Sequence, residues 1–130
     1  MSLIQGLGWR WGWNGERGLI GGEDWAMELS PEEWWDWCRR CDQIWSTWQT
    51  LQAHLMPGEN LTLEQHSPLL TLILTGSSEQ MTLYVQLHTG RVAEGQWQGA
   101  AVYSLLASVL QGAQGAFAES PSAALGEGPE

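Results

Sequence analysis

The sequence predicts an α+β protein in which two antiparallel meander sheets are each followed by one helix. Short stretches that alternate apolar and polar residues, separated by turn residues, indicate strands up to about residue 29 and again between residues 61 and 98. A long amphipathic segment follows each group of strands. The two halves, about 6–57 and 60–112, therefore share one order of elements, which indicates a repeated unit of strands followed by a helix.

The first predicted strand, residues 7–14, alternates three tryptophans with smaller or polar residues, and the Asn14-Gly15 pair is typical of a hairpin turn. Short strands at 18–22 and 25–29 complete a three-stranded meander. The tryptophans form either a stacking platform for a ligand or the inside of the sheet. The alternating glycines favour a close-packed sheet, so we expect Trp9 and Trp11 in the core, and Trp13, at the strand end, to be the most accessible of the three.

The longest helix is predicted to begin at Ser30, because Ser30 and Glu33 form an S-x-x-E capping box and Pro31 suits the first helical position. Pro57-Gly58 is expected to end it. Its apolar stripe contains Trp34, Trp37, Cys38, Cys41, Ile44, Trp45, Trp48, Leu51 and Leu55. The opposite, polar face contains Asp36, Arg39, Asp42, Gln43, Ser46, Gln49 and His54, with Trp35 among them.

The second half is expected to form strands at 61–66, 69–75, 80–88 and 92–98 and a helix from about 100 to 111, ended by Gly112. The third of these strands alternates clearly, which predicts a sheet with one buried and one solvent-facing side. Met81, Leu83, Val85 and Leu87 belong to the buried side, and Thr82, Tyr84, Gln86 and His88 to the other. Residues 1–117 are predicted to be one domain, and 118–130 have the composition of a disordered tail.

The charge is strongly acidic: 15 acidic residues stand against five arginines and no lysine, and the formal net charge is -10. This balance disfavours nucleic acid, since such binding depends on basic groups that neutralise phosphates. The longest apolar run, Leu69–Leu74, is too short to cross a bilayer, and no basic segment precedes an apolar run at the start of the chain. We therefore expect a cytoplasmic protein that does not associate with a membrane.

No set of residues indicates an active site or a metal site. Cys38 and Cys41 lie inside the predicted helix on its apolar stripe, so they lack the exposure and the helix N-terminus that activate a redox C-x-x-C pair. His54, His66 and His88 are scattered, and no serine, cysteine or aspartate has a recognisable nucleophile context. We expect no enzymatic activity, no metal and no cofactor.

Three segments, GLGWR, GLIGGEDWAMELSPEEW and GRVAEGQWQGAAV, resemble a family of small uncharacterised cyanobacterial proteins, the domain of unknown function 1818, from about Gly6 to Leu110. That family is grouped with the fold of single-stranded-DNA-binding transcriptional regulators such as the plant Whirly proteins. The resemblance implies paired units of four strands and a helix, and it implies no activity. In the Whirly proteins a lysine-containing strand segment contacts DNA. Since this chain has no lysine, the resemblance implies no DNA-contacting residue in it.

The first functional hypothesis is a protein-interaction or regulatory module, with an unidentified protein partner for which a basic protein is one candidate. Exposed aromatic residues are typical anchors of interfaces. The candidate interaction residues are therefore Trp13, Trp35, Tyr84 and His88. Trp35 has an alternative role, because the N-terminal segment or the tail could cover it.

The second hypothesis, from the fold resemblance, is single-stranded nucleic-acid binding. It requires Arg10, Arg17 and Arg91 to gather beside Trp13 or Trp97 as a positive patch on an acidic surface. If the arginines are dispersed or paired with acidic residues, the nucleic-acid hypothesis loses its support. A chain that contains both halves of a repeat has less need of a helix-swapped dimer, so we expect a monomer or a weak homodimer.

Overall fold

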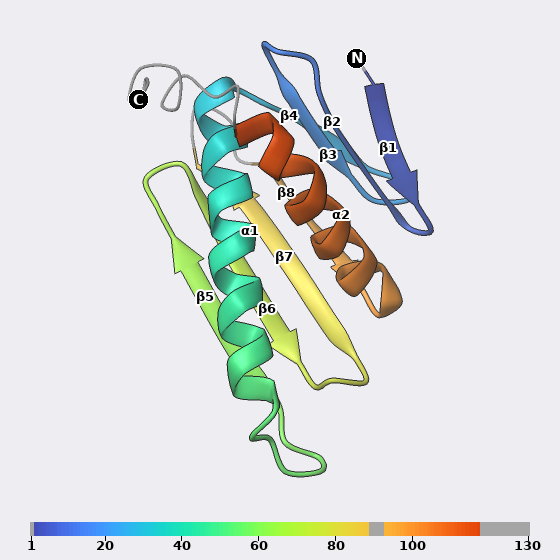
Figure 1. Ribbon diagram of the computed structural model, residues 1–130, viewed down its shortest axis with the longest axis vertical. Helices are drawn as coiled ribbons and strands as arrows, with labels where there is room; N and C mark the ends of the chain where they lie inside the picture. The colour runs from blue at the N-terminus through green and yellow to red at the C-terminus, as the bar shows by residue number, and fades with distance from the viewer. Residues whose placement is uncertain (1, 89–92, 118–130) are drawn as a thin grey trace.

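The computed structural model of the protein describes residues 2–88 and 93–117. Within them the chain forms two four-stranded antiparallel sheets, each followed by one helix, which confirms the predicted α+β class (Figure 1). The predicted tail, 118–130, and Arg91 lie outside the described residues. Among the described residues, neither helix combines the length and the apolar composition that crossing a membrane requires.

The first sheet has one strand more than the expected three. Its strands are, in spatial order, β1 (Ser2–Gly6), β2 (Trp9–Trp13), β3 (Gly18–Gly21) and β4 (Ala26–Leu29). The additional strand, β1, is an edge strand in which Leu3 and Ile4 are adjacent and both exposed, so the apolar alternation that reveals a strand is missing. Its pairing with β2 defines it instead, with Ile4 opposite Trp11.

The second sheet agrees closely with the prediction. Its strands are β5 (Leu61–His66), β6 (Leu70–Gly76), β7 (Met81–Leu87) and β8 (Ala93–Gln98), again in sequence order. The predicted buried side of β7 is confirmed, and the neighbouring residues of β6 continue it. This apolar face comprises Leu70, Leu72, Leu74, Met81, Leu83, Val85 and Leu87.

The first helix, α1 (Pro31–Gln52), has the predicted capping box at its start: the backbone N–H of Ser30 donates to Oε1 of Glu33, and the N–H of Glu33 donates to Oγ of Ser30. The helix ends at Gln52, before the expected Pro57-Gly58, where the N–H of His54 donates to the carbonyl of Leu51 at 3.0 Å and the N–H of Leu55 to that of Gln52 at 3.2 Å, in place of the α-helical pattern. Leu55 therefore lies outside the helix.

The second helix, α2 (Ala100–Phe117), continues past Gly112, where the sequence predicted its end. The indole of Trp11 lies against this glycine, so a Cβ atom at position 112 would approach Cη2 of Trp11 to 2.5 Å. Gly112 thus allows α2 to pack closely on β2 within a continuing helix.

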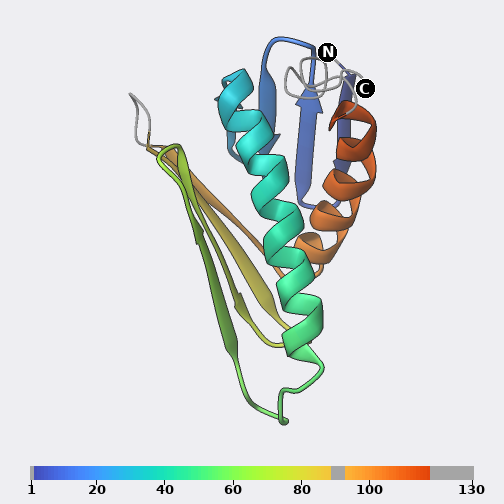
Figure 2. The same cartoon turned by 60° about the vertical axis from the view of Figure 1, so that its left-hand side comes forward.

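The helices connect the two halves. α1 follows the first sheet but contacts β5 and β6 of the second, whereas α2 follows the second sheet and contacts β1 and β2 of the first as well as β7 and β8. The two helices pack side by side on one face of the second sheet, and no described element covers its other face (Figure 2).

The core is rich in tryptophan. Trp9 and Trp11 are 7% and 5% exposed, which confirms that they belong to it. Between the halves, the ring centroids of Trp37 in α1 and Trp97 in β8 lie 5.5 Å apart. Together with the buried leucines of the second sheet, these rings form one apolar cluster that spans both halves.

Candidate functional site

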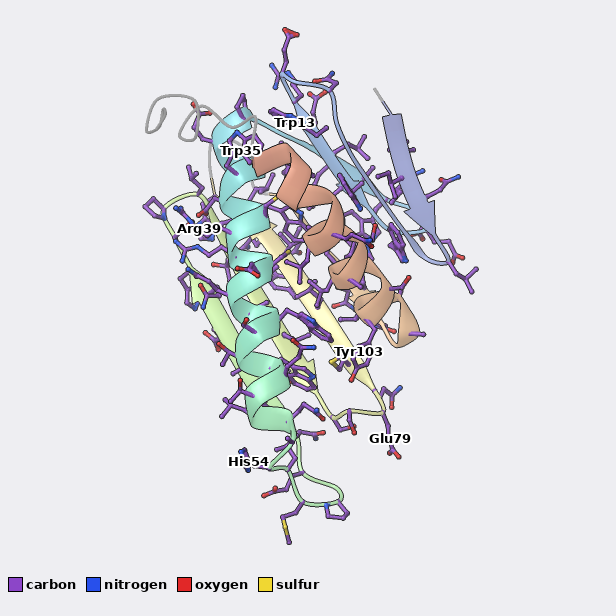
Figure 3. The ribbon with its side chains drawn as sticks, viewed as in Figure 1. Trp13, Trp35, Arg39, His54, Glu79 and Tyr103 are labelled. Atoms are coloured by element: carbon purple, nitrogen blue, oxygen red, sulfur yellow. The ribbon has the colours of Figure 1, made fainter. Side chains whose placement is uncertain are left out.

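The two tryptophans expected on the surface pack against each other. Trp13, at the end of β2, is half-buried because its ring stacks on that of Trp34, with centroids 5.7 Å apart and planes 7° apart. Trp35 meets Trp13 edge-on, with centroids 5.2 Å apart (Figure 3). Trp13 is the least buried of the three tryptophans of β2, as expected, but the two rings that α1 supplies leave it only partly accessible.

The described arginines do not form the positive patch that nucleic-acid binding requires. Nη2 of Arg10 donates to the backbone carbonyl of Trp25 at 3.3 Å, and Arg17 pairs with Glu28 at 3.8 Å. The two arginines lie at opposite ends of the β2–β3 hairpin. Trp97, expected beside them, is only 2% exposed, and its Nε1 donates to the carbonyl of Gly21 across the junction of the sheets. Trp97 is therefore a core residue, and no face of its ring is open to a base.

The remaining described arginines share a buried partner, Asp36. Arg39 and Arg40 bind Oδ1 of Asp36 at 3.1 and 3.2 Å, and the hydroxyl of Ser67 donates to Oδ2 at 2.5 Å. Asp36 was predicted on the polar face of the helix but is only 4% exposed, because the turn between β5 and β6 lies over it. Its role is to join α1 to that turn, and sequence reasoning missed it because the i,i+3 and i,i+4 spacing is equally typical of a solvated ion pair.

The two cysteines are free and buried on the inner side of α1, as predicted. Burial raises the pKa of both thiols well above the ordinary range, so neither is a thiolate near neutral pH. No group of three or more histidine, cysteine, aspartate or glutamate side chains in the described residues has the arrangement of a metal site.

The outer face of the second sheet brings together histidines that the sequence left scattered. Nδ1 of His66 and Nε2 of His88 lie 3.1 and 2.9 Å from the hydroxyl of Thr71, and Nε2 of His66 lies 2.7 Å from Oε1 of Glu64. The strands β5 and β6 and the residue directly after β7 thus contribute to one hydrogen-bonded row. His54 lies apart from it, just beyond the end of α1 (Figure 3). The periodicity of β7 indicated this face, whereas the link from His66 through Thr71 to His88 depends on the register between strands.

Tyr84 lies on the same outer face, as predicted, and its hydroxyl donates to Oε1 of Glu94 on β8 at 2.5 Å. This hydrogen bond raises the pKa of Tyr84, and partial desolvation and the negative charge of Glu94 act in the same direction. The phenol is therefore held neutral and oriented along the sheet.

The chain matches the family described as a domain of unknown function, DUF1818, over residues 4–111. The chain belongs to the DUF1818 family. The resemblance of its three sequence segments to that family is confirmed.

The solved structures include a relative of this DUF1818 protein. The crystal structure of a protein of unknown function from the DUF155 family of Prochlorococcus sp. NATL2A is similar to it, with a TM-score of 0.78 and 27% sequence identity. The similarity covers 84% of this chain and 96% of the other. No curated protein matches the chain. These comparisons support the fold and assign no activity.

In this DUF1818 protein the hydroxyl at the centre of the hydrogen-bonded row is buried. The hydroxyl of Thr71, which both histidines approach, is on a side chain only 7% exposed, so a substrate has no access to it as a nucleophile. The outer face instead presents exposed side chains that donate and accept hydrogen bonds. The candidate functional site is therefore this outer face, which consists of Thr62, Glu64, His66, Thr71, Ile73, Thr75, Thr82, Tyr84, Gln86, His88, Glu94, Gln96 and Gln98.

Proposed function

We propose that this DUF1818 protein is a non-enzymatic interaction module that binds a basic protein partner through the outer face of its second sheet. The observation that carries the proposal is that no described element covers this face, while both helices lie on the opposite one (Figure 2). A sheet face that carries an oriented tyrosine, histidines and amides has the mixed aromatic and polar character of a protein interface.

The charge of the chain supports a basic partner. The net charge is -10, and among the described residues the outer face carries Glu64 and Glu94 but no arginine or lysine. Each of the four described arginines is already engaged, three with carboxylates and Arg10 with a carbonyl. Electrostatic complementarity therefore favours lysine and arginine on the partner and opposes a polyanion.

The absence of an enzymatic role is part of the same proposal. Its support is the burial of both thiols and of the Thr71 hydroxyl, which leaves the described histidines without an accessible nucleophile. We also propose a cytoplasmic location, since two free cysteines are typical of a reducing compartment.

Site-specific photo-cross-linking tests the proposed function. A benzophenone amino acid is placed at Gln86, on the outer face, and in a matched variant at Asp42, on the exposed side of α1. We expect Gln86 to give a discrete adduct in native extract whose cross-linked peptide is rich in lysine and arginine, and which is lost at 0.5 M salt and in Tyr84→Ala. Equal labelling from Asp42, or no adduct from Gln86, contradicts the proposal.

The alternative, single-stranded nucleic-acid binding, has a separate test. Intrinsic tryptophan fluorescence is titrated with mixed-sequence single-stranded DNA at low salt and again at physiological salt. We expect no saturable quenching at micromolar DNA, because the described arginines are engaged. Saturable quenching that weakens as salt rises would replace the protein-interaction proposal with the nucleic-acid one.

A further inference from the structure

The strand β8 is an edge strand, paired only with β7. The backbone N–H of Gly99, directly after β8, donates to the carbonyl of Met81 at 2.8 Å. Because hydrogen-bonded and non-hydrogen-bonded pairs alternate along an antiparallel ladder, this bond fixes which residues of β8 face β7. The backbone N–H and C=O groups of Glu94, Gln96 and Gln98 consequently point away from β7, and no described backbone group pairs with them.

The strand β8 itself lacks the features that usually protect an exposed edge. Proteins block edge strands with proline, lysine, a bulge or a covering element, because unpaired backbone groups bind any extended chain that approaches. The sequence of β8 is AEGQWQ, which contains neither proline nor lysine, and its register with β7 runs without a bulge from Ala93 to Gln98.

A groove of about 530 Å³ runs along this edge. Residues 94–98 of β8 form one side, and the turn between β3 and β4, residues 22–25, forms the other. The ring of Trp25 lies against Gly95, where a Cβ atom would approach Cη2 of the ring to 2.5 Å, and its centroid is 5.0 Å from that of Trp97. The aromatic wall of the groove is thus held in place by core packing.

The groove is acidic. Glu23 and Asp24 in the β3–β4 turn are exposed, and neither forms an ion pair with a described residue, while Glu94 lines the opposite side. No arginine or lysine lines the groove. Trp25 is half-buried and adds an aromatic surface on which a guanidinium group or an aliphatic stem can lie. Charge complementarity therefore selects a cationic occupant.

We infer that the free edge of β8 binds an extended basic segment of the partner protein, which pairs with Glu94, Gln96 and Gln98 as an additional strand and places arginine or lysine side chains beside Glu23, Asp24 and Trp25. This inference rests on the proposed function and names the kind of partner and how it binds. Backbone hydrogen bonds supply affinity in such strand addition, and alternate side chains supply specificity. A small cation or a metal would leave the three outward-facing backbone positions unused.

The test uses the full chain and a synthetic peptide of alternating arginine and valine, blocked at both ends, with binding measured by calorimetry and by NMR hydrogen exchange. We expect saturable binding that slows exchange of the amides of Glu94, Gln96 and Gln98. The same peptide N-methylated at alternate residues keeps its charge but cannot pair as a strand, so its affinity should fall at least tenfold. Equal affinity of both peptides overturns the inference, because charge alone then explains the binding.

Two variants at one position add a matched control. Proline is tolerated on an edge strand where its missing N–H faces solvent, so Gln96→Pro should fold and lose at least tenfold in peptide affinity. Gln96→Ala keeps the N–H and should bind within twofold of the original chain. If Gln96→Pro binds the peptide like Gln96→Ala, strand addition is wrong. If Gln96→Pro shows that strand addition is wrong but still gives the Gln86 cross-link, the proposed function stands without strand addition. If the original chain also gives no Gln86 cross-link, the proposed function fails as well.

Discussion

The indole ring of Trp34, in α1, lies against Gly18 of β3 so closely that a Cβ atom at Gly18 would be 2.4 Å from Cε3 of the ring. Gly95 and Trp25 stand in the same relationship at the junction of the two sheets. At both places the bare backbone of a strand forms the surface on which a large ring packs. Glycine is therefore required at these positions because a side chain would have no room, and not because of the backbone conformation.

Replacing Gly18 by alanine should lower the free energy of unfolding by about 1–3 kcal/mol, since the extra methyl group overpacks a buried contact. Urea denaturation followed by far-UV circular dichroism measures the change. The same substitution in a Trp34→Phe background, where the ring is smaller, should cost clearly less. Additive losses in this double-mutant cycle would show that the ring and the glycine do not interact.

Asp36→Asn should destabilise the protein by about 1–3 kcal/mol, because the buried carboxylate accepts charge-assisted bonds from Arg39 and Arg40 and a bond from Ser67. Asp42→Asn is the matched control on the exposed side of the same helix and should change stability by less than about 0.5 kcal/mol. Equal effects in urea denaturation would contradict the role of Asp36 in joining α1 to the β5–β6 turn.

The pKa of Tyr84 should fall toward its ordinary value in Glu94→Gln, because the acceptor of its hydrogen bond loses its negative charge. Tyrosine labelled with carbon-13 at Cζ reports the titration by NMR. Glu64→Gln removes a different carboxylate, which binds His66, from the same face and should leave the Tyr84 titration unchanged. An unaltered titration in Glu94→Gln would mean that another group raises the pKa.

The two buried thiols should make stability fall in alkaline solution. The pKa values of the two thiols in the folded state lie above those in the unfolded chain. Their contribution to the free energy of unfolding is therefore complete below about pH 8.5 and is lost as the pH rises further. Between pH 7.5 and pH 9.5 we expect a loss of about 1 kcal/mol per thiol in urea denaturation under reducing conditions. A variant with both Cys38→Ala and Cys41→Ala should show a shallower loss; an equal slope would show that other groups cause it.

Much of the fold could be predicted because its signals are local. The capping box at Ser30 and the alternation in β7 depend only on nearby residues, and both are confirmed. The strand β1 lacks a local signal, because its pairing with β2 and its contact with α2 define it and neither can be seen in its own residues. The reason for a glycine inside α2 is likewise distant in the chain, because Gly112 leaves room for the ring of Trp11, about a hundred positions away.

The candidate site was predictable to a lesser extent. The period of β7 placed Tyr84 on the outer face, but its bond to Glu94 and the row that links His66 to His88 depend on strand register. Trp13 is more exposed than Trp9 and Trp11, as its place at the strand end predicted, but its half-burial depends on the rings of Trp34 and Trp35 in α1. Pairwise contacts between distant segments decide each of these cases.

The exchange of contacts between halves has a consequence for how the chain acquires its structure. Since α1 covers β5 and β6, the apolar side of the second sheet is incomplete without a helix that belongs to the first half, and α2 in turn reaches back to β1 and β2. Neither half encloses its own interior. A break in the connection between residues 53 and 60 would therefore yield two fragments that bind each other. Each fragment alone would expose an apolar surface to solvent. Folding of this chain therefore requires its two halves to associate with each other, as two subunits of a dimer do.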